Sequence, residues 1–231
     1  MIKFSDFEKK IKVIFNDKNL LKQAFIHRSY INENPLSSLA HNERLEFLGD
    51  AVLELIVTDF LYKKYPQHTE GELTALRSAL VNAIIISEIA SAAGMNDYLL
   101  LSKGEAKDNG KARQYILANT YEALVGAIYL DQGYGTTERF VAQTLLPETE
   151  EIVNKKLWRD AKSLVQEKAQ EFVSATPAYK VLSESGPDHD KHFTVGIYFK
   201  ADLVAEGKGK SKQEAEQSAA LAALKAKNWL D

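Results

Sequence analysis

The sequence predicts a chain of two domains, an all-α domain followed by a small α+β domain whose elements run α-β-β-β-α. Two observations favour this division. Up to about Glu151 apolar residues recur at helical spacing in one segment after another, whereas beyond Trp158 short runs rich in aromatic and β-branched residues stand between two helical segments. The 231 residues, 45% of them hydrophobic, suffice for one large core or two modest ones. We therefore expect domains at 1–151 and 160–231, joined by a linker at 152–159.

Boundary residues delimit the helices of the first domain. Asp17 is a favourable N-cap, Pro66 cannot continue a helix and Gly133 favours a helix end. Between such boundaries the apolar residues lie on one side of each helix, as the core of a helical domain requires. The expected helices cover residues 18–30, 42–65, 72–94, 111–131 and 136–146.

The second domain combines two helices with three short strands. The run from Phe193 to Phe199 has the aromatic and β-branched content of a strand, and Ala201-Asp202 is a candidate for a tight turn after it. We expect helices at 160–174 and 211–228, and strands at 178–184, 192–200 and 203–207.

Cysteine usage and hydropathy limit the class of protein. The chain has no cysteine, which excludes disulfides, thiolate zinc sites and cysteine nucleophiles. Its first residues are charged and amphipathic, unlike a signal peptide, and Asn82 and Glu88 interrupt the longest apolar stretch. We therefore expect a soluble, cytoplasmic protein without a membrane partner.

The net charge taken over the whole chain is misleading. The 29 basic and 32 acidic residues give only −3, which argues against a nucleic-acid-binding protein. Up to Glu151, however, there are 16 basic and 21 acidic residues, and beyond it 13 and 11. The small net charge is therefore the sum of an acidic first domain and a slightly basic second one. Binding of nucleic acid would have to depend on local lysines.

A row of acids marks the helix expected at 42–65. Glu43, Glu46, Asp50 and Glu54 fall within one narrow stripe at about 100° per residue. The opposite side, expected to face the core, carries Leu45, Leu48, Val52, Leu55 and Ile56. Stacked like charges destabilise a helix, so the row is either a solvated acidic face or a site for a divalent cation, which prefers oxygen ligands.

Residues of the helix expected at 111–131 bear on that choice. Asn119 and Glu122 lie three positions apart in an otherwise apolar segment. A glutamate there needs a partner, and a metal ion shared with Glu46 and Asp50 would supply one. Phe47 falls close to the acidic stripe, so it is either an aromatic residue at the edge of the core or an anchor in a partner subunit.

Lysines gather at the start of the last expected helix. Lys208, Lys210 and Lys212 surround Ser211, a favourable N-cap. Backbone N–H groups and lysines facing the same way form a site for an anion such as phosphate, although a solvated Gly/Lys loop has the same composition.

At this point the residues resemble a known family. His41-Asn-Glu-Arg-Leu-Glu-Phe-Leu-Gly-Asp50 is similar to the signature of bacterial ribonuclease III, an endonuclease specific for double-stranded RNA. The resemblance extends to His27–Tyr30, Glu70–Ser78 and Ile116–Gly126, and the last third of the chain resembles the double-stranded-RNA-binding domain that follows the nuclease in that family.

The resemblance implies a role for each acidic residue. Glu46, Asp50, Asn119 and Glu122 would hold Mg²⁺, with Mn²⁺ as a substitute, and Glu43 would lie close to the attacking water. Asp50, Glu122 and Glu43 would thus be catalytic residues. Glu70 would be an accessory contact to the RNA. Phe47 would insert into the other subunit of a homodimer.

The resemblance also implies the reaction and its substrate. Each strand of the duplex, in precursors of ribosomal and messenger RNA, would be hydrolysed to a 5′-phosphate and a 3′-hydroxyl without an organic cofactor. Gln166 and Gln170 would contact 2′-hydroxyls in one minor groove, and the loop carrying His189 would enter the next. The lysines and Ser211 would bind the phosphates between the two grooves.

Asn119 departs from the family pattern, which usually has aspartate at this position. An amide oxygen still coordinates Mg²⁺ but brings no negative charge. The alternative to an active nuclease is therefore a double-stranded-RNA-binding protein with weakened or absent cleavage.

Overall fold

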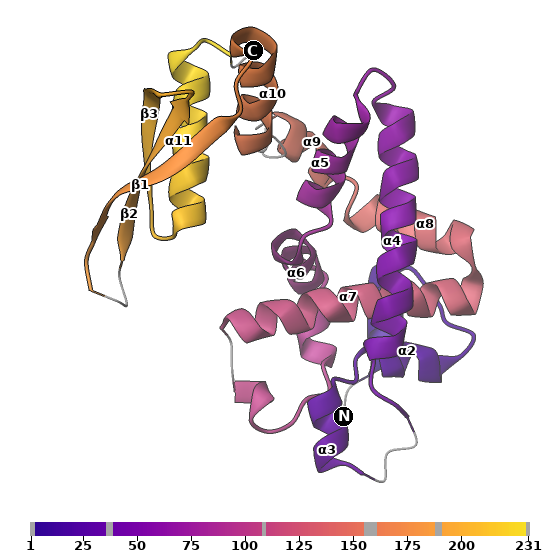
Figure 1. Cartoon of the computed structure of the whole chain (residues 1–231). Helices are drawn as coiled ribbons and strands as arrows, with labels where there is room; N and C mark the ends of the chain where they lie inside the picture. The colour runs from indigo at the N-terminus through magenta and orange to yellow at the C-terminus, as the bar shows by residue number, and fades with distance from the viewer. Residues whose placement is uncertain (1–2, 36–38, 108–109, 155–160, 188–190, 230–231) are drawn as a thin grey trace. The chain divides into compact units, whose positions relative to one another are not determined.

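The chain forms two compact units, Met1–Trp158 and Arg159–Asp231 (Figure 1). The computed structural model describes residues 3–35, 39–107, 110–154, 161–187 and 191–229. The first unit is helical, and the second places two helices against a three-stranded antiparallel sheet. The predicted fold class is confirmed. His189 lies outside the described residues.

The first unit contains nine described α-helices and two short 3₁₀ helices. They are α1 (Phe4–Ile11), α2 (Lys18–Ala24), α3 (Arg28–Glu33), α4 (Glu43–Lys64), α5 (Glu70–Leu80), α6 (Ala83–Ala92), η1 (Met95–Tyr98), η2 (Glu105–Lys107), α7 (Lys111–Gln132), α8 (Tyr134–Thr144) and α9 (Glu148–Asn154).

The helix predicted at 18–30 is wrong as one element, because the chain breaks between α2 and α3. Ile26 forms a parallel bridge with Leu100, and its carbonyl accepts the backbone N–H of Asn42 at 2.9 Å. These partners lie far along the chain, so the hydrogen bonds that interrupt the helix leave no local signal.

The helix predicted at 72–94 is also two helices. α5 starts at Glu70, because Thr69 and Glu72 form a capping box, and it ends at Leu80. Asn82 then caps α6, accepting the backbone N–H groups of Ile84 and Ile85 at 3.0 Å each. Asn82 is thus an N-cap rather than a polar residue inside one long helix.

Two smaller expectations also differ from the structure. Residues 152–154 of the predicted linker belong to α9, where Ile152 is 2% exposed and packs in the core of the first unit. The remaining linker residues, 155–159, lie outside the described part of the chain. Leu55, expected on the core side of α4, is 57% exposed.

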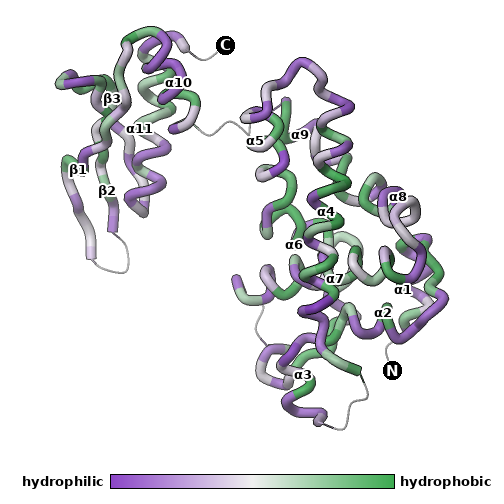
Figure 2. The backbone as a smooth tube through the Cα atoms, turned by 45° about the vertical axis from the view of Figure 1, so that its right-hand side comes forward, coloured by the Kyte–Doolittle hydropathy of each residue, from purple (hydrophilic) through white to green (hydrophobic). Residues whose placement is uncertain are grey.

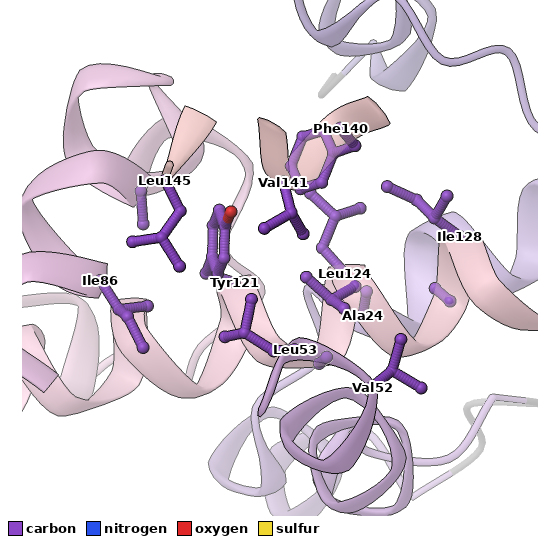
Figure 3. Packing of buried hydrophobic residues seen from close by; sticks show 14 of the residues in the cluster. Ala24, Val52, Leu53, Ile86, Tyr121, Leu124, Ile128, Phe140, Val141 and Leu145 are labelled. Carbon is purple, nitrogen blue, oxygen red and sulfur yellow. The ribbon is translucent and has the colours of Figure 1, made fainter. Parts of the chain in front are cut away.

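One hydrophobic core fills the first unit, and α7 runs through it. Tyr121 is fully buried on α7 among residues of α4, α6 and α8, including Leu53, Ile86 and Val141 (Figure 3). Its hydroxyl lies 2.7 Å from the Thr144 hydroxyl, which satisfies the polar atom within the core. Along α4, by contrast, hydrophobic and hydrophilic residues alternate, as on a helix with one exposed side (Figure 2).

The crossing of α4 and α7 depends on two glycines (Figure 1). A Cβ atom on Gly49 would lie 1.8 Å from the carbonyl oxygen of Glu122, and one on Gly126 would lie 2.2 Å from that of Leu45. Each glycine therefore faces the backbone of the other helix. This contact fixes which residues of α4 lie beside which residues of α7.

The second unit is built on the strand order β1-β2-β3. Its elements are α10 (Ala161–Val173), β1 (Pro177–Ser185), β2 (His192–Phe199), β3 (Asp202–Gly209) and α11 (Lys212–Ala226). Both helices cover one face of the sheet (Figure 1), and a small core that includes Val165, Ile197 and Leu224 lies between the layers. The tight turn comes one residue earlier than predicted, since Phe199 pairs with Asp202 across Lys200-Ala201.

No single helix of the described residues is long and apolar enough to cross a membrane; one pair, α5 with α6, bent by 45°, meets the criteria of length and composition together.

Replacing Gly126 should disrupt the crossing. We expect Gly126→Ala to lower the free energy of unfolding by about 3 kcal/mol, because the added methyl group meets backbone rather than a movable side chain. The control is Gly71→Ala on α5, where a Cβ meets nothing within 4 Å; it should not lower stability. Urea unfolding of both variants measures the difference, and equal stability of the two would contradict the role of the crossing.

Candidate active site

The crossing of α4 and α7 brings together the carboxylates that the sequence singles out. Burial raises the pKa of Glu122 from its usual 4.5 to about 7, and the charges of Asp50 and Glu46 add to the effect. Burial likewise raises the pKa of Glu46, with further contributions from Glu43 and Asp50. Four acids from two helices therefore interact through one half-buried region, in which a negative charge is unfavourable without a cation.

Asn119 takes part in this cluster directly. Its side-chain amide donates a hydrogen bond to the Glu46 carboxylate, which partly offsets the rise in the pKa of Glu46. An ionised aspartate in the same place has no proton to donate and would add a further negative charge. Asn119 therefore lowers the electrostatic repulsion of the metal-free site.

Glu54 does not belong to the cluster, although it continues the acidic stripe of the sequence. Its side chain is exposed, and its charge does not contribute to the raised pKa of Glu46 or of Glu122. The solvated-face interpretation holds for this residue.

The donor set fits a hard divalent cation by its chemistry. Glu46, Asp50 and Glu122 offer carboxylate oxygens and Asn119 an amide oxygen. Within the described ranges no three His, Asp or Glu side chains are already grouped so that they could hold a metal ion. The side chains would therefore have to turn toward an ion, which their partial exposure permits.

A cleft of about 560 Å³ opens beside the cluster. Glu43 lies within it, 3.9 Å from Arg28 Nη1 and 3.7 Å from His41 Nδ1. Other residues that line the cleft are His27, Glu46, Glu105 and Asn119. The carboxylate of Glu43 thus lies near Arg28 and His41 at the edge of the acidic cluster.

Sequence reasoning missed several residues that build the site. Asn42 is buried at the start of α4, where its Nδ2 donates to the carbonyl of Ala24 at 3.0 Å. It thereby fixes the end of α4 that carries Glu43 and Glu46. A polar residue directly before the acidic row could have indicated the role of Asn42 from the sequence. The roles of Gly49 and Gly126 become apparent only from the packing of α4 on α7.

Phe47 and Glu70 lie apart from the cluster. Phe47 is 82% exposed on α4, so of the two interpretations an aromatic residue at the edge of the core is wrong. Glu70 is exposed at the start of α5, which follows the C-terminal end of α4. That end of α4 lies roughly 27 Å along the helix from Glu46, at about 1.5 Å per residue. The structure therefore does not bring Glu70 to the carboxylates, and its contact with RNA stays a prediction.

The predicted RNA contacts of the second unit divide between two faces of the sheet. Gln166 and Gln170 are exposed one turn apart on α10. Gly207 of β3 packs against α11, since a Cβ there would lie 2.0 Å from the backbone nitrogen of Ala219. Side chains alternate along a strand, so Lys208 projects from the face of the sheet opposite the helices. The structure thus places Lys208 on the face of the sheet away from α11, the helix that begins at Lys212.

The start of α11 already holds an acidic side chain. Ser211 is the N-cap, as predicted, and its Oγ accepts the backbone N–H of Glu214 at 3.1 Å. The Glu214 carboxylate in turn accepts the backbone N–H of Lys210 at 2.8 Å. These two amides are therefore already bonded within the protein and are not free to bind a phosphate.

Lys212 is shared between two neighbours. Its Nζ lies 3.3 Å from the Glu184 carboxylate of β1 and 5.7 Å from the ring centroid of Phe193. Since its side chain is 60% exposed, the ammonium group remains accessible to an anion. Glu184 competes for that charge.

Comparisons with known proteins agree with both units. Two family descriptions match the chain, "Ribonuclease-III-like" over residues 17–149 and "Double-stranded RNA binding motif" over residues 161–227. The chain is 45% identical to "Ribonuclease 3" of Borreliella burgdorferi, covering 96% of this chain and 90% of the relative. It is 42% identical to "Ribonuclease 3" of Bdellovibrio bacteriovorus, covering 95% and 94%.

A solved structure resembles the first unit. The nuclease domain of ribonuclease III from Campylobacter jejuni, whose title describes flexibility in a region involved in dimer formation, is 37% identical with a TM-score of 0.56. The match covers 61% of this chain and 94% of that domain.

Removing the charge of Glu122 should stabilise the metal-free protein. Because the pKa of Glu122 is raised from 4.5 to about 7, ionisation opposes folding; this cost is absent below pH 4.5 and complete above pH 7. We expect Glu122→Gln in EDTA at pH 8 to gain about 1–3 kcal/mol in free energy of unfolding. The gain should vanish as the pH falls to 4.5.

Chemical unfolding from pH 4.5 to 8 tests this expectation, with Glu54→Gln as the control. Glu54 lies on α4 outside the cluster, so its replacement should change stability little at any pH. A Glu122→Gln variant no more stable than wild type at pH 8 would contradict the repulsive cluster.

Releasing Lys212 from its ion pair should strengthen RNA binding. We expect Glu184→Gln to bind duplex RNA about two- to fivefold more tightly at low salt, because an exposed ion pair is worth about 1 kcal/mol or less. Glu206→Gln is the matched control, since Glu206 neighbours Gly207 on β3 and projects from the opposite face of the sheet. Electrophoretic mobility shifts in EDTA measure both affinities, and equal gains would show a general charge effect instead.

Proposed function

Since this chain belongs to the ribonuclease III family and is an endoribonuclease of double-stranded RNA, we propose that it cleaves at the acidic cluster with the aid of divalent cations, Mg²⁺ in the first place. The observation that carries this proposal is the meeting of Glu46, Asp50 and Glu122 at the crossing of α4 and α7, where the pKa of Glu122 rises to about 7. Unneutralised carboxylates of this kind favour a cation among them.

Glu46, Asp50, Asn119 and Glu122 would hold the ion, because all four present hard oxygen ligands. When bound, a divalent cation lowers the pKa of water and neutralises charge on the scissile phosphate. Mn²⁺ offers the same charge and a similar ligand preference, so we propose that it substitutes for Mg²⁺.

Glu43 would orient the attacking water. Its carboxylate lies beside Arg28 and His41 in the cleft, at 3.9 Å and 3.7 Å. A carboxylate so placed accepts a hydrogen bond from water and directs its lone pair toward the phosphorus. Direct attack by water needs no covalent intermediate, and leaves a 5′-phosphate and a 3′-hydroxyl.

The second unit would hold the duplex. Gln166 and Gln170 lie exposed at a spacing suited to neighbouring 2′-hydroxyls of one minor groove. Lys210 and Lys212 at the start of α11 would meet phosphates, and the loop with His189 would reach the next minor groove. Precursors of ribosomal and messenger RNA, present in the cytoplasm, are the substrates that we propose.

We also propose a homodimer in which Phe47 inserts into a second copy of the chain. The side chain is 82% exposed, and Leu55, two turns further along α4, is 57% exposed. Exposed apolar residues on one helix favour an interface. The Campylobacter jejuni relative, whose title refers to dimer formation, supports the same assembly.

The alternative of a binding protein without cleavage finds no support among the relatives. They carry the name of the enzyme and match this chain over nearly its whole length. In the structure, moreover, Asn119 relieves repulsion at Glu46 rather than disturbing the cluster.

A cleavage assay over a Mg²⁺ titration tests the proposed site. We expect the wild-type protein to cut long duplex RNA to 5′-phosphate ends. Asn119→Asp should lower the half-saturating Mg²⁺ concentration about tenfold, through one more negative charge beside the ion. Asn19→Asp on α2 adds the same charge at an exposed position away from the cleft and should leave the titration unchanged. Absence of wild-type cleavage at every Mg²⁺ and Mn²⁺ concentration would refute metal-dependent cleavage.

The oligomeric state tests the role of Phe47. Light scattering after gel filtration should give a dimer for wild type and a monomer for Phe47→Ser, because burial of one aromatic anchor contributes several kcal/mol to an interface. Ile14→Ser is the control, since Ile14 is 73% exposed but lies outside α4. A dimer that persists in Phe47→Ser would place the interface elsewhere.

A further inference from the structure

His27 lies beside the acidic cluster and has no role in the proposed metal site. It is the N-cap of α3, where its Nδ1 accepts the backbone N–H of Ser29 at 3.3 Å. The same Nδ1 lies 2.8 Å from the Ser29 hydroxyl oxygen. Both contacts use one ring nitrogen, so Nε2 is left for other partners.

The hydrogen bonds around Ser29 fix the tautomer of the ring. Ser29 N–H donates to Nδ1, so Nδ1 carries no proton. The Ser29 Oγ accepts the backbone N–H of Ser102 at 3.1 Å and keeps its own proton to donate to Nδ1. The neutral ring must then carry its proton on Nε2. This assignment follows from the donors and acceptors around the ring.

The charges around His27 favour this neutral form. Burial lowers its pKa, and the positive charges of Arg28 and His41 act in the same direction, whereas Glu105 and Glu43 oppose them. The ring therefore presents an uncharged N–H donor of fixed orientation. Among the described residues no hydrogen-bond acceptor for Nε2 is recorded.

His27 lines the cleft together with Glu46 and Asn119. Arg28, the next residue, lies 3.9 Å from Glu43 at the same edge. The donors His27 and Arg28 and the acids Glu43 and Glu46 thus line the same cleft. An RNA strand between them would present its phosphate oxygens to the donors and its reacting phosphorus to the acids.

We propose that His27 is a further substrate-contacting residue, which donates a hydrogen bond from Nε2 to a phosphate oxygen at the scissile bond. The proposal rests on cleavage at the acidic cluster and adds a contact that positions the strand. The Ser102–Ser29–His27 chain of hydrogen bonds holds the donor in place before substrate arrives, which avoids the entropic cost of ordering it.

Two amide variants separate this contact from the capping of α3. In His27→Asn the side-chain Oδ1 takes the place of Nδ1 and still caps the helix, but nothing replaces Nε2. In His27→Gln the amide reaches the place of Nε2, while no acceptor remains at the place of Nδ1. If His27 contacts RNA, His27→Asn should keep its melting temperature and lose about tenfold in single-turnover cleavage rate at saturating Mg²⁺. His27→Gln should melt at a lower temperature and cleave faster than His27→Asn.

A capping role alone predicts the reverse order of cleavage rates, and that result would overturn the proposal. The tautomer gives a readout independent of activity. Long-range ¹H–¹⁵N correlation spectra of the metal-free protein should show His27, identified by its loss in His27→Asn, protonated on Nε2 near pH 7.5. A proton on Nδ1 would also overturn the proposal. Failure of the wild-type protein to cleave would instead refute cleavage at the cluster, so the two failures are distinguishable.

Discussion

The structure of the first unit depends on the contact between Gly49 and Gly126, which allows α4 and α7 to cross with their backbones touching. Side chains larger than hydrogen would separate the helices at this point. The close crossing has two consequences. It places Glu46 and Asp50 of one helix beside Asn119 and Glu122 of the other, and it lets α7 bury 12 of its 22 residues in the core. Folding and the acidic cluster therefore share one packing constraint.

The packing of the first unit keeps the acidic residues of the cluster close together although their negative charges repel one another. Half-buried carboxylates with a raised pKa oppose folding in the absence of a cation, and the core must offset that cost. The surrounding loops are correspondingly well anchored: Asn42 binds the carbonyl of Ala24, and the buried Arg113 donates to the carbonyl of Glu105 at 2.7 Å. A rigid frame of this kind keeps the acidic residues close when they would otherwise separate.

The sequence predicted features that depend on local chemistry. Pro66 and Gly133 end helices because of their own backbone geometry. The bounds of α4 and α7 therefore agree with the predicted ones to within one residue. The break around Ile26 and the exposure of Leu55 were not predictable, because they follow from Leu100 and from the arrangement of neighbouring helices. Long-range contacts limit the prediction of the site in the same way. Its acids were visible as a sequence pattern, whereas the orientation of the His27 ring depends on Ser29, which in turn contacts Ser102.

The acidic excess of the first unit affects how RNA approaches the cleft. A cleft rich in carboxylates repels RNA, so an anionic substrate approaches it favourably only when cations lie between the two. In the second unit Glu184 engages Lys212 and Glu214 engages the backbone of Lys210, so both carboxylates compete with phosphate at the start of α11. Weak attraction without metal and stronger attraction with it would couple binding to the presence of the ions that the proposed cleavage uses. The small net charge of the chain is consistent with this coupling, because a strongly basic protein would bind RNA whether or not its site held metal.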